Sequence, residues 1–147
     1  MRPRTWAVLI AVMLFGAASF LVARWLSTDG VERAKIERLL EAQGRGDADA
    51  MAREIADCYS ACRNRLEKLA RRLRKPGAEL RIARYDSDTS RALGEKTGQT
   101  RVVWFLGDDL PTVQCVEVRR KGNPLTGPTV TLLRLSAPIE REAPCRN

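Results

Sequence analysis

The hydrophobic pattern begins with an uncharged apolar run over residues 6–23. A helix from Trp6 to Trp25 rises about 28 Å, which is close to the roughly 30 Å hydrocarbon core of a bilayer. Trp6 and Trp25 stand at its two ends, where amphipathic indole rings suit the headgroup regions. We therefore expect residues 1–26 to form a transmembrane signal anchor, with Trp6 and Trp25 at the membrane interfaces.

The charges beside this run indicate its orientation. Arg2 and Arg4 favour a cytoplasmic N-terminus, although Arg24 weakens the asymmetry. A cleaved signal peptide is the alternative, but the small residues at 16–18 and 21–23 make imperfect cleavage sites. We expect an uncleaved anchor in the plasma membrane, with a secreted form as the alternative. In both cases residues 27–147 form one extracytoplasmic domain.

Helical periodicity follows the anchor. Residues 27–30 suggest a short break, after which Asp29 can cap a helix with Glu32 in capping-box spacing. The glycines at 44 and 46 end this helix. One face of this helix carries Ile36, Leu39, Leu40 and Gln43.

A second stripe starts after Asp47, the next candidate cap. Its apolar positions recur every three or four residues and therefore lie on one helical face. They fit either one helix or two helices separated near residues 57–60, and Pro76 ends the pattern. The stripe comprises Ala48, Met51, Ile55, Cys58, Cys62, Leu66, Leu69 and Leu73.

The period changes to two after Gly77, and segments rich in Val, Leu, Ile, Thr and aromatic residues alternate with turn residues. Helices followed by several short strands predict an α+β domain with helices packed on one face of an antiparallel sheet. The expected strands are Leu80–Tyr85, Thr100–Leu106, Thr112–Arg120 and Thr129–Ala137.

Composition narrows the chemistry. The 147 residues include 26 Lys and Arg, 18 Asp and Glu, and no His. Omitting the three arginines of the anchor leaves 23 basic residues and a net charge of about +5. The absence of His excludes a His general base and a His metal ligand. We expect no nucleic-acid partner, because aromatic residues do not alternate with the basic ones and the domain lies outside the cell.

The segment "LLEAQGRGDADAMAREIAD", followed by a further helix and hairpin strands, resembles the nuclear-transport-factor-2-like (SnoaL-like) superfamily. The similarity is a pattern of elements over residues 31–139 and includes no signature motif. It implies a cone in which the N-terminal helices lie in the concave side of a curved sheet. The superfamily contains isomerases, dehydratases and non-catalytic partners, and some members have a membrane anchor before the cone.

Four cysteines, an even number in an extracytoplasmic domain, favour two structural disulfides over a zinc site or a redox dithiol. Cys58 and Cys62 are four residues apart on the apolar stripe. If that helix is continuous, their β-carbons lie about 5–6 Å apart, too far for a disulfide. We therefore expect each of them to pair with either Cys115 or Cys145, and the sequence leaves the partner of each open.

A polar group at the end of the first strand offers the one candidate pocket. Asp86 could act as a base, with Tyr85 or Tyr59 as a donor, if the cone buries them. The alternative is an ordinary polar strand end. Trp104 faces either the helices or this pocket. We predict no metal and no cofactor.

Two basic clusters, residues 71–75 and 119–121, are interpreted as solvated ends of elements, with contact to anionic lipid or a wall polymer as the alternative. The sequence as a whole predicts a non-catalytic membrane-anchored scaffold or binding module in the cell envelope, with a protein partner there. The alternative is an extracytoplasmic enzyme or small-molecule binder that uses the cone.

Overall fold

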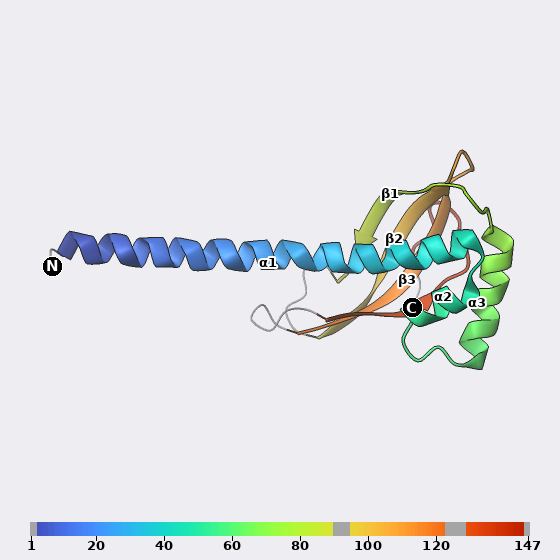
Figure 1. Ribbon diagram of the computed structural model, residues 1–147, viewed down its shortest axis with the longest axis horizontal. Helices are drawn as coiled ribbons and strands as arrows, with labels where there is room; N and C mark the ends of the chain where they lie inside the picture. Colours follow the sequence, from blue (N-terminus) through green and yellow to red (C-terminus); the bar gives the residue numbers. More distant parts are fainter. Residues whose placement is uncertain (1–2, 90–94, 123–128, 146–147) are drawn as a thin grey trace.

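The computed structural model describes residues 3–89, 95–122 and 129–145, without the side chains of residues 3–5, 7, 21 and 23–29. It has an α+β architecture, as expected, in which helices pack on one face of an antiparallel sheet (Figure 1). The elements are α1 (Pro3–Arg45), α2 (Ala48–Glu54), α3 (Ser60–Leu73), β1 (Leu80–Ser87), β2 (Lys96–Leu106), β3 (Thr112–Lys121) and β4 (Thr129–Leu135).

Helix α1 is 43 residues long and continues without a break through residues 27–30. The helix start expected at Asp29 is therefore wrong. This segment contains no proline, and one glycine inside a helix costs only about 1 kcal/mol relative to alanine. The predicted end is confirmed: Gly46 has a φ of +78°, and its N–H donates to the Gln43 carbonyl at 3.0 Å.

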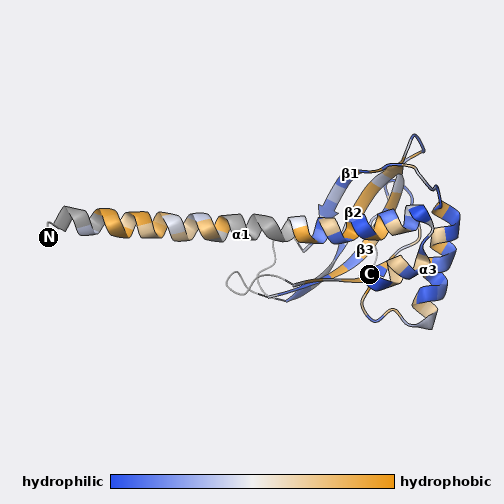
Figure 2. Cartoon of the chain, viewed as in Figure 1, coloured by the Kyte–Doolittle hydropathy of each residue, from blue (hydrophilic) through white to orange (hydrophobic). Residues whose placement is uncertain are grey.

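The first half of α1 projects away from the domain and is predominantly apolar (Figure 2). Among the residues that the structure describes, no helix combines the length and the apolar character needed to cross a membrane. Trp6 is 58% exposed, whereas the side chain of Trp25 lies outside the described residues. The other exposed large apolar side chains of this segment are Val8, Leu9, Ile10, Val12, Met13, Leu14, Phe15, Phe20 and Val22.

The second helical stripe is split into α2 and α3, which confirms the two-helix alternative. Asp47 caps α2, since its carboxylate accepts from the Ala50 N–H at 2.8 Å. The chain then extends at Ile55, which forms a parallel bridge with Leu132 of β4. Asp57 follows with a φ of +52°. This turn breaks the helix while the apolar residues on both sides of it still reach the core.

The four strands form an antiparallel sheet in the order β1-β2-β3-β4. All four lie where the pattern predicts them, although β2 begins four residues earlier than expected, at Lys96. Irregular pairing interrupts the register between Ile82 and Arg84 on β1 and between Glu117 and Val118 on β3.

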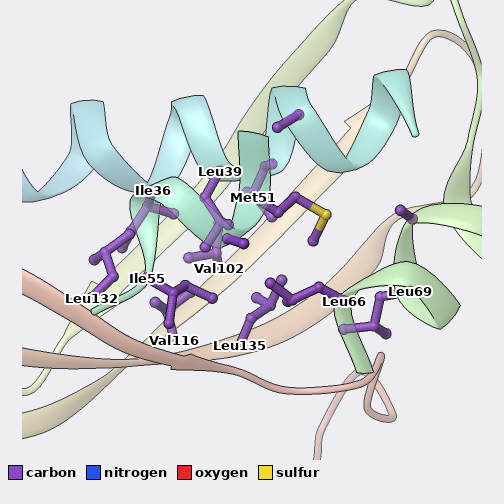
Figure 3. Close-up of a cluster of buried hydrophobic side chains, with 14 of the residues drawn as sticks. Ile36, Leu39, Met51, Ile55, Leu66, Leu69, Val102, Val116, Leu132 and Leu135 are labelled. Atoms are coloured by element: carbon purple, nitrogen blue, oxygen red, sulfur yellow. The ribbon is translucent and has the colours of Figure 1, made fainter. Parts of the chain in front are cut away.

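The core lies between the inner face of the sheet and the second half of α1 (Figure 3). α2 and α3 close the end of this core that is distant from the N-terminus (Figure 1). Its buried side chains include Ile36 and Leu39 of α1, Met51 of α2, Leu66 and Leu69 of α3, and Val102, Val116, Leu132 and Leu135 of the sheet.

Candidate functional site

A buried carboxylate on α1 is the most polar feature of the interior. The side chain of Glu32 is 0% exposed and lies among side chains of the sheet. Its Oε1 accepts hydrogen bonds from the hydroxyls of Tyr85 and Thr100, both at 2.5 Å. Its Oε2 accepts from the Thr89 hydroxyl at 3.1 Å and from Arg120 Nε at 2.6 Å. One carboxylate therefore joins α1 to β1, β2 and β3.

The protonation of Glu32 follows from these contacts. Burial by itself raises the pKa of this carboxyl, but the hydrogen bonds from Thr100, Tyr85 and Arg120, together with the Arg120 charge, outweigh it. The pKa of Glu32 consequently lies below its ordinary value, and the group is ionised at neutral pH. Four donors occupy the lone-pair positions of the two oxygens. This arrangement suits a structural ion pair better than a base that must accept another proton.

Glu32 does not have the role that the sequence pattern predicts. The pattern places Glu32 in a capping box at a helix start, but α1 runs through this position and the Glu32 side chain is buried in the domain. One signal for this role is present in the sequence: Glu32 precedes Ile36, Leu39, Leu40 and Gln43 at helical spacing and so lies on the same apolar face. An acidic residue on a buried face needs a cationic partner, which Arg120 provides.

All four cysteines form disulfides, as predicted, but the expected pairing is wrong. Cys58 pairs with Cys62 and Cys115 pairs with Cys145. The expectation assumed a continuous helix, whereas α3 begins only at Ser60, so Cys58 lies in the preceding turn. Their Cα atoms are consequently 5.1 Å apart, within the range that a disulfide spans.

The second disulfide attaches the C-terminal tail to β3. Before it, the Ser136 N–H donates to the Cys115 carbonyl at 2.9 Å, and the Ile139 N–H donates to the Val113 carbonyl at 2.8 Å. The tail therefore continues the hydrogen bonding of β3 beyond the end of β4 and returns to Cys145.

The candidate pocket residues do not converge. Tyr59 is 75% exposed in the turn before α3. Asp86 is exposed and pairs with Arg84 at 2.6 Å, whereas Tyr85 points inward to Glu32. Trp104 is buried in the core that faces the helices, where its Nε1 donates to Gln114 Oε1 at 2.9 Å. The proton chemistry required a buried Asp86, and the structure does not bury it.

Two open depressions adjoin each other on the surface. A groove of about 230 Å³ lies between α3 and β4, and its apolar lining is formed by Ile55, Cys62, Leu66, Leu133 and Leu135. Arg65 and Arg134 also line it. Both arginines border a wider depression of about 1020 Å³ that reaches Lys96 and Glu117. In the described ranges, no three His, Cys, Asp or Glu side chains cluster closely enough to hold a metal ion.

Comparison with known proteins finds no match, whether against protein-family models, curated proteins or solved structures.

Proposed function

We propose that this chain is a single-pass membrane protein whose extracytoplasmic domain acts as a non-catalytic scaffold or binding module in the cell envelope. The observation that carries the proposal is the character of α1. Its first half exposes many large apolar side chains, and its second half packs on the sheet as part of the core of the domain. An exposed apolar surface of this size is unfavourable in water and indicates contact with lipid or protein.

The sequence of that segment favours lipid. The 18 residues from Trp6 to Ala23 carry no charge and are apolar on every side of the helix, as a bilayer requires. The N-terminus is assigned to the cytoplasm because Arg2 and Arg4 precede the run. Two disulfides support an oxidising compartment for the domain, which agrees with this orientation.

The interior supports a role in binding rather than in catalysis. The inner face of the sheet is occupied by the apolar core and by the Glu32 ion pair, and Glu32 already accepts four hydrogen bonds. Trp104, a candidate for the pocket wall, is packed in this core. Helices on one face of an antiparallel sheet also agree with the proposed resemblance to the nuclear-transport-factor-2-like superfamily.

A protein partner fits best in the groove between α3 and β4. Its apolar lining offers a site for hydrophobic side chains, and Arg65 and Arg134 add positive charge beside it. Charge complementarity therefore favours a partner segment that combines apolar and acidic residues. Cys62 lies in the groove wall, so the Cys58–Cys62 disulfide holds one side of it in place.

The test is the intact mass of the full chain after expression in a secretion-competent bacterial host. Membrane and soluble fractions are measured separately, with and without reduction. The proposal predicts full-length protein in the membrane fraction with the mass of four hydrogens missing, one pair for each disulfide. A shorter soluble product would show that the N-terminal segment is a cleaved signal peptide and not an anchor. Four free thiols in the membrane-bound chain would overturn the extracytoplasmic assignment.

A further inference from the structure

The contacts of Glu32 place one end of the sheet close to the proposed anchor. Thr89 follows β1, and Arg120 lies next to the end of β3, and both side chains bind Glu32. This end of the sheet therefore lies beside residue 32 of α1. Figure 1 shows β1 and β3 ending toward the N-terminal half of α1, whereas α3 lies at the opposite end of the domain.

The separation from the membrane follows from helix geometry. From Trp25 to Glu32 the helix rises about 10 Å. Each headgroup region is about 5–7 Å thick outside the hydrocarbon core. With Trp25 at the hydrocarbon boundary, this end of the sheet lies a few Å from the headgroups, which is less than the Debye length of about 8 Å at physiological salt.

Exposed basic side chains occupy this end. Lys96 begins β2, and Arg119 and Lys121 flank the buried Arg120 on β3. Among the residues that the structure describes here, two acidic ones lie nearby: Asp88, whose backbone carbonyl accepts from Lys96 Nζ at 2.8 Å, and Glu95, whose Oε2 is 3.8 Å from Lys121 Nζ. Both acidic residues are exposed, and the three cations outnumber them.

We propose that Lys96, Arg119 and Lys121, here called the proximal rim, bind the headgroups of anionic phospholipids in the membrane that holds α1. The inference rests on the proposed anchor and adds a lipid specificity to it. Each basic residue close to an anionic surface contributes about fivefold to the affinity. The other basic cluster has no such role, because Arg71 and Arg72 lie at the end of α3, away from the anchor (Figure 1).

The experiment uses the full chain, purified from a bilayer that contains equal amounts of phosphatidylglycerol and phosphatidylcholine. The lipids retained by the protein are quantified by mass spectrometry. Wild type should retain more phosphatidylglycerol than the bulk ratio, and the variant Arg119→Gln/Lys121→Gln should lose most of this excess. The matched control Arg71→Gln/Arg72→Gln removes the same charge from exposed positions on α3 and should behave as wild type.

A second measurement tests lipid binding by the proximal rim independently of membrane insertion by the anchor. Amide hydrogen exchange of the full chain is compared in discs of pure phosphatidylcholine and discs with phosphatidylglycerol. The anionic lipid should slow exchange at residues 119–121 and leave α3 unchanged. Equal amide exchange at residues 119–121 in both kinds of disc would overturn the lipid-binding role of the proximal rim but not the proposed anchor. Equal phosphatidylglycerol retention by wild type and by the rim variant would do the same. Failure of the chain to enter any disc would instead reject the proposed function.

Discussion

The Glu32 cluster allows a sharp test of how the domain is held together. The substitution Glu32→Gln preserves the shape of the side chain and removes its charge. The new amide has one oxygen, which accepts at most two of the four hydrogen bonds that the carboxylate accepts. Arg120, whose side chain is only 6% exposed, then loses its ion pair with Glu32.

The magnitude follows from the burial of this pair. Removing one partner of a buried ion pair typically costs about 3–5 kcal/mol, because the other charge stays buried after that partner is lost. For a domain of this size the loss corresponds to a decrease in Tm of roughly 10–20 °C. The double variant Glu32→Gln/Arg120→Met removes the buried cation as well, so it should recover much of the loss.

The assay is thermal unfolding of the full chain in detergent micelles, followed by circular dichroism. The control is Asp109→Asn, which removes an ion pair with Lys75 of the same 2.6 Å length but with both side chains about half exposed. Its cost should stay below about 1 kcal/mol, because solvent screens the pair. If Glu32→Gln were as stable as this control, or if Arg120→Met restored nothing, the structural role of the pair would be refuted.

The stability difference between wild type and Glu32→Gln should depend on pH. Because the pKa of Glu32 is lower in the folded than in the unfolded chain, its ionised form stabilises the fold at neutral pH. This contribution should decline as the pH falls below the ordinary carboxyl value of 4.5 and through the lowered folded value. The difference in stability between wild type and Glu32→Gln should therefore narrow in acid. A constant difference between pH 7 and pH 3 would contradict the assignment.

Three further predictions concern stability and are measured by the same unfolding assay. Cys115→Ser removes the disulfide whose cysteines are 30 residues apart and should lower the free energy of unfolding by about 3–4 kcal/mol. Cys58→Ser removes the disulfide whose cysteines are 4 residues apart and should lower it by about 2 kcal/mol. Gln43→Met should stabilise the domain by about 1–3 kcal/mol, because both polar atoms of the buried Gln43 side chain lack a partner among the described residues. Gly98→Ala should cost about 1–3 kcal/mol, since the new Cβ would lie 2.8 Å from the Thr89 methyl; unchanged stability would contradict this overpacking.

Local patterns predicted the elements well where one rule dominated. The strands followed from their period of two, and the end of α1 followed from Gly46, which adopts a φ of +78°. The continuity of α1 through residues 27–30 could not be predicted in this way. The cap signal at Asp29 is local, whereas the helix that passes through it is held by the packing of Ile36 and Leu39 on the sheet.

The residues of the candidate site could not be paired from the sequence, because their partners lie on distant segments. Glu32 and Arg120 are 88 residues apart, and their pairing requires the register that places β3 beside α1. The disulfide pairing depended on a single turn at Asp57, because the same apolar spacing fits one helix or two. Asp86 and Tyr85 are neighbours in sequence but lie on opposite faces of β1, so only Tyr85 reaches the interior.

The unbroken course of α1 has a mechanical consequence. One helix runs from the proposed anchor into the core, so no flexible linker joins the two. The rotation of the domain about the helix axis is therefore fixed by the number of helical residues between them. Inserting one residue between Trp25 and Glu32 would turn the whole domain by about 100° and lift it by about 1.5 Å. Inserting seven residues would nearly restore the original rotation of the domain about the helix axis but would lift the domain by about 10 Å. The rotation of the domain about the helix axis and its height above the bilayer are thus both set by the number of residues in one short helical segment.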